Sequence, residues 1–100
     1  MAKVDRAALR TALRTAFALS VRSLRLAAKI SQERLAVESG MDRGHVFALE
    51  QGRHYPTLET IYKLAPRLGV SPARFMEVVD QEVKKIMAQA HRERDGSKDG

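Results

Sequence analysis

Cationic side chains are concentrated in the first third of this 100-residue chain. Residues 1–29 contain seven lysines and arginines against one acid, Asp5, whereas residues 30–100 carry equal numbers of basic and acidic groups. The first third therefore carries the whole formal net charge of +6. A focused positive field attracts phosphates without regard to sequence, which favours a polyanionic partner. The alternative is a solvated helix face, and charge alone does not decide between the two.

A second group of residues suited to polar recognition follows Asp42. Arg43 stands at the expected start of a capped helix, where its guanidinium is either solvated or free to donate to an external acceptor. His45 and His54 have no partner at metal-ligand spacing, so we expect phosphate or surface positions for them and no metal. Phe47 either offers an apolar contact to a partner or packs beside the turn.

Catalytic and cofactor-binding patterns are missing from the sequence. The absence of cysteine excludes disulfides, zinc–thiolate sites and cysteine nucleophiles. There is no phosphate-cradling glycine loop and no catalytic constellation of carboxylates and histidines on adjacent helical turns. We therefore expect neither an enzyme nor a cofactor. No apolar run approaches the ~18 residues of a membrane span, so we expect a cytoplasmic protein with no membrane partner.

The sequence predicts that the segments carrying these residues are helices. Residues 4–29 contain no glycine or proline and are rich in alanine, leucine and arginine, which are strong helix formers. Apolar residues at spacings of three and four predict the buried face of this segment: Leu9, Leu13, Phe17, Val21, Leu24 and Ala28. The sequence leaves open whether it is one helix or two. In one continuous helix the early arginines must overhang the domain edge; otherwise the helix breaks near residues 14–17.

The start of the chain also has the composition of an organellar transit peptide, being rich in arginine and poor in acids. However, the same stretch supplies Phe17, Val21 and Leu24 to the predicted core. A removable presequence would not usually carry the first helix of its own domain, so we favour the structural role.

Two short helices are predicted in the middle of the chain. A serine N-cap opens a helix over about residues 32–39, and Gly40 ends it in a left-handed turn. Asp42 is expected to cap the next helix, over about residues 43–51. Ala36 is small enough for the second helix to approach the first closely. A shared core beneath the crossing is predicted from the spacing of Leu35, Met41, Val46 and Leu49.

The rest of the chain predicts two more helices and a tail. Thr57 is expected to cap a helix that runs to Leu68 and contains Pro66, for which the sequence suggests no role. A serine–proline pair at positions 71 and 72 opens a fifth helix, expected to run to about His91. Residues 95–100 are polar with two glycines and are expected to be disordered.

Several stretches between residues 17 and 79 resemble the lambda-repressor/Cro-like helix-turn-helix family. They are Phe17-x3-Val21-Arg22-x-Leu24-Arg25, Ile30-Ser31-Gln32-Glu33-x-Leu35-Ala36, Ser39-Gly40-Met41-Asp42-Arg43, Val46-x2-Leu49-Glu50-Gln51-Gly52-Arg53, Pro56-Thr57-Leu58 and Leu64-Ala65-x2-Leu68-Gly69-Val70-Ser71. The resemblance implies an all-α, five-helix DNA-binding domain over residues 17–79. A basic helical extension would precede it at 1–16, and a helical extension with a disordered tail would follow at 80–100.

The resemblance also implies which residues meet DNA. Gln32 matches a position at a helix start that holds a phosphate and can brace the recognition helix. The base-facing positions are matched by Arg43, Gly44 and Ala48, with His45 and Phe47 flanking them. Arg43 would contact O6 and N7 of a guanine, and Phe47 would either contact a thymine methyl group or pack beside the turn. The loop that grips the DNA backbone is matched by Gln51, Arg53, His54 and Tyr55, and we expect the tyrosine to stack on the fold with its hydroxyl toward phosphate. Because two base-facing residues are small, selectivity would depend on Arg43, methyl contacts and DNA deformability.

Other positions are expected to hold the domain together or to extend its contacts. In the family, an acid matching Glu50 commonly pairs with an arginine matching Arg25 and ties the recognition helix to the scaffold. Flanking phosphate contacts are a hypothesis for Arg6, Arg10 and Arg14. An apolar stripe on the fifth helix, whose first part also closes the core, is favoured as a dimer interface over packing on the N-terminal extension: Phe75, Met76, Val79, Val83 and Ile86.

The function expected from these features is transcription regulation through double-stranded DNA. A homodimeric repressor or repressor–activator would bind a palindromic operator, and the size and Met-Asp-Arg opening resemble restriction–modification controllers. The alternative is an antitoxin-type protein that binds its own promoter and holds a partner toxin through its terminal extensions. The operator and the regulated genes are not specified by the sequence.

Overall fold

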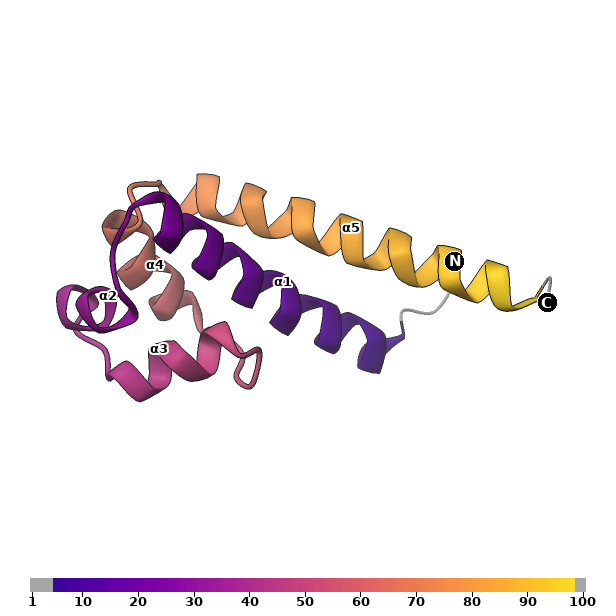
Figure 1. Ribbon diagram of the computed structural model, residues 1–100, viewed down its shortest axis with the longest axis horizontal. Helices are drawn as coiled ribbons and strands as arrows, with labels where there is room; N and C mark the ends of the chain where they lie inside the picture. Colours follow the sequence, from indigo (N-terminus) through magenta and orange to yellow (C-terminus); the bar gives the residue numbers. More distant parts are fainter. Residues whose placement is uncertain (1–4, 99–100) are drawn as a thin grey trace.

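A computed structural model describes residues 5–98, and side chains within residues 5–93. Across that range the chain forms five helices and no strand, so the predicted all-α class is confirmed. In Figure 1 three short helices gather at one end, while two long ones run together away from it. None of the described helices is long and apolar enough to cross a membrane. The five helices are α1 (Arg6–Ala27), α2 (Gln32–Ser39), α3 (Arg43–Glu50), α4 (Leu58–Arg67) and α5 (Pro72–Lys98).

The first helix is continuous. The Asp5 carboxylate caps α1 by accepting from the Ala8 N–H at 3.1 Å, and the helix then runs for 22 residues without a break near 14–17. The composition explains this, because no residue in the segment interrupts the backbone hydrogen bonding. The expected boundary between residues 16 and 17 therefore lies inside a helix. Of the two alternatives, the structure takes the one in which the early arginines overhang the domain.

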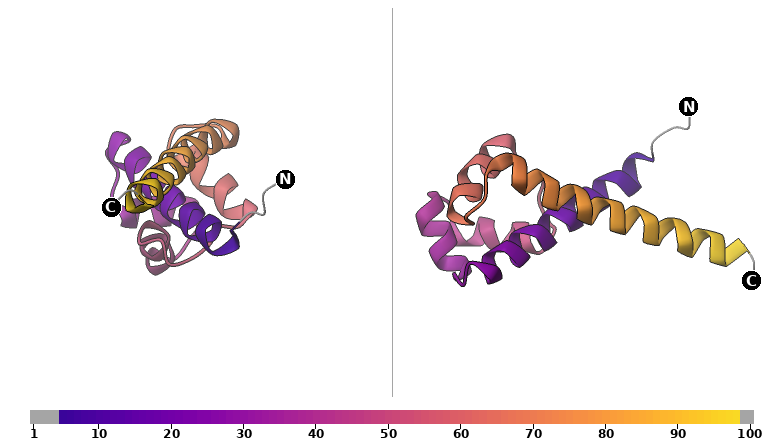
Figure 2. Two further views of the ribbon diagram at one scale, coloured as in Figure 1. Left: turned by 90° about the vertical axis from the view of Figure 1, so that its right-hand side faces the viewer. Right: turned by 90° about the horizontal axis from the view of Figure 1, so that it is seen from above.

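The buried face of α1 differs from the predicted stripe in its first half and at Ala28, which is the exposed C-cap of the helix. Ala12 and Ala16 are 1% and 0% exposed, whereas Leu13 is 36% exposed, so the prediction of Leu13 as a core residue is wrong. The helix that packs most extensively on α1 is α5, and Figure 2 shows the two crossing before their far ends diverge. The hydroxyl of buried Ser20 is satisfied by donating to the Ala16 carbonyl at 2.7 Å.

A single core joins all five helices, and it includes part of the stripe assigned to a dimer. The rings of Phe17 and Phe75 lie 5.4 Å apart, and Phe75 and Val79 are only 0% and 4% exposed. The prediction that these two residues form a dimer interface is wrong, because the side chains are covered within one chain. Val83 and Ile86 are half-buried against the same core, and Met76 is exposed.

The last helix is longer than predicted. α5 reaches Lys98 instead of stopping near His91, so residues 95–98 of the expected disordered tail are helical. Between Ala73 and Asp95 there is no glycine or proline, and the polar side chains of this segment include good helix formers. Contacts one turn apart support it, such as the Gln89 amide donating to Glu93 at 3.0 Å. Positions 99–100 lie outside the described residues.

The predicted turns occur with one difference in capping. The hydroxyls of Ser31, Thr57 and Ser71 each accept a backbone N–H at the start of their helices. Asp42 occupies the N-cap position of α3 in an extended conformation, but its side chain makes no capping hydrogen bond. The carboxylate is exposed to solvent, which can satisfy it without the helix. Asp42 therefore marks the start of α3 without capping it through its side chain.

Candidate nucleic-acid interface

The turn between α2 and α3 places α3 at the edge of the domain. Gly40 ends α2 with φ 66° and ψ 36°, a left-handed conformation that a β-carbon would strain. On α3, Val46 and Leu49 are fully buried and anchor one face in the core. The opposite face carries the residues matched to base contacts, of which Arg43 and Gly44 are exposed. The helix is thus fixed on one side and free on the other (Figure 1).

A bidentate ion pair ties α3 to α1. The Arg25 Nε lies 2.7 Å from Glu50 Oε2, and its Nη2 lies 3.0 Å from Oε1. The same guanidinium donates through Nη1 to the Ile30 carbonyl at 3.0 Å. The side chains of Arg25 and Glu50 are 12% and 3% exposed, so water competes little for the pair. The hydrogen bonds to Glu50 raise the pKa of Arg25 above its ordinary value, which keeps the guanidinium charged.

Gln32 joins this network at the start of α2. Its side-chain Nε2 donates to Glu50 Oε1 at 3.2 Å, so the residue braces the end of α3 as the sequence suggested. An amide nitrogen carries two hydrogens, and one remains to donate to an external acceptor. The half-buried side chain stands at the first position of a helix capped by Ser31. Gln32 can therefore hold both the scaffold and a phosphate.

The loop after α3 folds back on the exposed face of that helix. The Arg53 guanidinium lies 5.9 Å from the centre of the Phe47 ring, and Phe47 is 43% exposed. The rings of His45 and His54 meet edge to face at 6.3 Å. Within the described residues, no three histidines, cysteines or acids come together as metal ligands. These contacts present cationic and aromatic groups beside α3.

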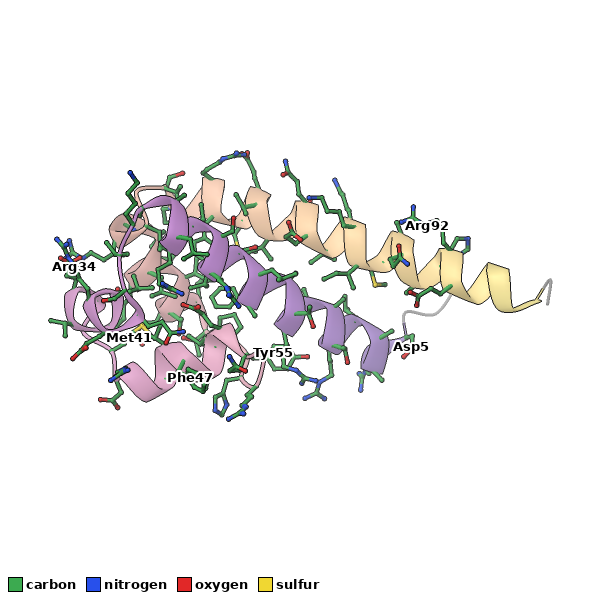
Figure 3. All side chains as sticks on the ribbon, in the orientation of Figure 1. Asp5, Arg34, Met41, Phe47, Tyr55 and Arg92 are labelled. Carbon is green, nitrogen blue, oxygen red and sulfur yellow. The ribbon has the colours of Figure 1, made fainter. Side chains whose placement is uncertain are left out.

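Tyr55 connects this loop to the overhanging part of α1. Its hydroxyl accepts a hydrogen bond from Arg10 Nε at 3.1 Å. The guanidinium carbons of Arg10 and Arg14 lie 5.4 and 5.3 Å from the centre of the tyrosine ring. Figure 3 shows Tyr55 between the end of α3 and α1. The sequence predicted that this ring stacks on the fold, but it did not identify the two arginines as the partners.

The positive charge on this side of the molecule is not neutralised. Some exposed cations elsewhere pair with a carboxylate one helical turn away, as in Arg74 with Glu77 at 3.0 Å and Lys84 with Asp80 at 3.2 Å, whereas exposed Arg67 donates to the Glu38 carbonyl at 2.8 Å. Among residues 5–93, no carboxylate pairs with the cations of the α1 overhang, of the start of α3 or of the following loop: Arg6, Arg10, Arg14, Arg43 and Arg53. Their charge is available to an external anion.

Comparison with known protein families identifies the family to which this arrangement of helices belongs. A family model described as helix-turn-helix matches residues 21–75, which include α2, the turn, α3 and α4. The chain belongs to the helix-turn-helix family. This membership confirms the predicted resemblance to lambda-repressor/Cro-like regulators, and it covers both helices that carry the candidate interface.

Relatives within the family are named as regulators. The chain is 33% identical over 66 residues to the control protein C.BamHI of Bacillus amyloliquefaciens, covering 65% of this chain and 82% of that one. The clp gene regulator ClgR of Corynebacterium glutamicum has a similar structure, with a TM-score of 0.75, 27% identity and coverage of 82% and 87%. A third similar structure is the restriction–modification controller C.Esp1396I, solved as a tetramer with its natural 35-base-pair operator. It has a TM-score of 0.66 and 25% identity, and the match covers 71% of this chain and 93% of that one.

Proposed function

We propose that this helix-turn-helix regulator is a sequence-specific DNA-binding protein that acts as a homodimer on a palindromic operator. The observation that carries the proposal is the exposed face of α3. This face begins with Arg43, which has no carboxylate partner among the described residues, and the Arg25–Glu50 pair joins the end of the helix to α1. A rigid helix with one free face, at the edge of a domain, has the dimensions to enter a major groove.

Each part of the interface has a separate role in this proposal. Arg43 reads guanine, while Phe47 and Ala48 offer apolar contacts and His45 flanks them. The backbone of the DNA is held at both ends of the helix-turn-helix, by Gln32 at the start of α2 and by the loop after α3. The loop residues are Gln51, Arg53, His54 and Tyr55. The operator complex of C.Esp1396I supports this reading, since that regulator has a similar structure. A cytoplasmic location, where bacterial DNA is found, fits the proposal.

Gly44 offers a direct test that leaves the fold intact. A β-carbon built on Gly44 meets no atom within 4 Å, so a larger side chain is accommodated there. We expect the double variant Gly44→Glu/Ala48→Glu to bind a random-sequence duplex about tenfold more weakly, because two carboxylates then face the phosphates. Fluorescence anisotropy with a labelled duplex measures this affinity.

The matched control is Gly44→Gln/Ala48→Gln, which has the same side-chain size without the charge. It is expected to retain most of the non-specific affinity. Equal binding by wild type and the glutamate variant, with both folded by circular dichroism, would mean that α3 does not face DNA.

The homodimer is proposed through the outer part of α5, with two recognition helices about 34 Å apart on the DNA. Phe75 and Val79 are buried within the chain and cannot contact a partner. The proposed dimer surface therefore consists of Met76, which is 45% exposed, and the half-buried Val83 and Ile86. Sedimentation equilibrium at micromolar concentration is expected to give twice the mass of the chain, and Met76→Lys to shift the protein toward monomer. A purely monomeric wild type would contradict the dimer.

A further inference from the structure

We propose that Arg10, Arg14 and Tyr55 form a preassembled phosphate clamp that extends the DNA interface along the first half of α1. This inference rests on the proposed DNA-binding function and adds a second backbone contact to it. The helix-turn-helix match begins at residue 21, so the two arginines lie outside the matched segment.

The arginines of α1 are spaced to follow a charged backbone. Arg6, Arg10 and Arg14 recur every four residues, which keeps them on neighbouring turns at intervals of about 6 Å along the helix. Together with Ala7 and Thr11 they line a shallow open groove. Ala7 and Thr11 have short side chains that do not cover the arginines, so an anion can reach the guanidinium groups.

Tyr55 orients two of these guanidinium groups. Arginine side chains are flexible, and holding them beforehand lowers the entropy lost when they bind a ligand. Here the aromatic ring lies within about 5.4 Å of both guanidinium carbons, and the hydroxyl holds Arg10 through Nε. The Nη groups of Arg10 are not used in that bond, and the tyrosine hydroxyl keeps its own hydrogen to donate. The three side chains thus present several donors to a single phosphate.

The loop and α1 also meet through their backbones. A β-carbon placed on Gly52 would lie 3.7 Å from the Arg14 carbonyl oxygen, which shows how closely the loop approaches the helix. The loop therefore meets α1 at two points, through its backbone at Gly52 and through the side chain of Tyr55. A phosphate bound at the loop would also lie beside the arginines of α1, so the clamp continues the surface that grips the DNA backbone.

The salt dependence of binding to a random-sequence 30-base-pair duplex tests the clamp. The variant Arg6→Ala/Arg10→Ala/Arg14→Ala keeps strong helix formers in α1 and removes three charges. We expect the slope of log affinity against log salt to become shallower by about 2 to 3, since each phosphate contact contributes about 0.9. The control, Arg74→Ala/Lys84→Ala/Lys85→Ala on α5, loses the same charge and should change the slope by less than about 1.

Tyr55 variants separate orientation from charge. Tyr55→Ala removes no charge, yet we expect it to weaken binding about threefold to tenfold and to make the slope shallower by about 1. Tyr55→Phe retains the ring and should fall between alanine and wild type. Thermal melts confirm that each variant is folded before its affinity is compared.

The outcomes distinguish the clamp from the proposed function. A wild-type protein that fails to bind duplex DNA overturns DNA binding itself. A wild type that binds, with equal slopes for the α1 and α5 triple variants, overturns the clamp alone. A Tyr55→Ala variant that binds as wild type does also overturns it, because the ring would then have no part in orienting the arginines.

Discussion

Replacing Glu50 with alanine is expected to lower the free energy of unfolding by about 3 kcal/mol. The substitution leaves the Arg25 guanidinium, 12% exposed, with one carbonyl acceptor in place of a bidentate carboxylate. It also removes the acceptor of the Gln32 side chain. A buried charge that loses its partner is far more costly than an exposed ion pair that is broken. For a domain of this size the melting temperature should fall by roughly 10 to 20 °C.

The control for this prediction is Glu38→Ala. Glu38 forms a 3.0 Å ion pair with Arg34, but their side chains are 38% and 65% exposed, so its loss should cost less than about 1 kcal/mol. Urea unfolding followed by circular dichroism compares the two variants directly. If Glu50→Ala is no less stable than Glu38→Ala, the pair does not hold α3 to the scaffold.

Arg43→Ala is expected to reduce affinity for the preferred operator by about 10- to 100-fold for each half-site, the value of one bidentate guanine contact. Its effect on random-sequence DNA should be only a few-fold, because one phosphate-attracting charge is lost there. Arg43 is the first residue of α3, is exposed, and has no carboxylate partner in the described part of the chain. Gly44 and Ala48 add no polar side chain, so the loss is not replaced by a neighbour.

Arg43→Lys separates charge from geometry. Lysine keeps the positive charge but lacks the planar fork that matches guanine O6 and N7, so it should restore non-specific binding more than operator binding. Parallel titrations with the operator and with a scrambled duplex measure both effects. Equal losses on the two duplexes would assign Arg43 to phosphate and remove it as the base reader.

The sequence predicted the helices α2 and α3 and the turn between them better than it predicted the packing around them. Caps and glycines fix α2 and α3 locally, because the serine at 31 and the glycine at 40 act through neighbouring backbone groups. The apolar stripe of α1 was less informative, since hydrophobic spacing does not say which neighbour covers a residue. Ala12 is buried and Leu13 is not, although both lie within the helical segment that the pattern predicts, because burial depends on how α3 and α5 pack on α1. For the same reason, the spacing of Phe75 and Val79 did not show whether a partner or the chain's own core covers them, and the structure places both in the core.

The contact between Tyr55 and α1 could not be predicted from local pattern. Arg10 and Tyr55 are 45 residues apart, and their contact depends on the path of a loop that ends at Pro56. Periodicity indicated that the early arginines would overhang the domain if α1 continued. It gave no sign that an aromatic ring would lie under them, because that requires the positions of α3 and α1 in space. The pairing of Arg25 with Glu50 joins residues 25 positions apart and was inferred only through resemblance to the family.

Selection of DNA from a random pool by the full-length protein tests sequence-specific recognition by α3 most directly. The predicted result is an enriched inverted repeat whose half-sites are centred about one helical turn, 10 to 10.5 base pairs, apart. Each half-site should contain a guanine at which the Arg43→Ala protein loses its preference. Enrichment of no motif by a folded protein that binds duplex DNA would contradict sequence-specific recognition and leave only non-specific binding.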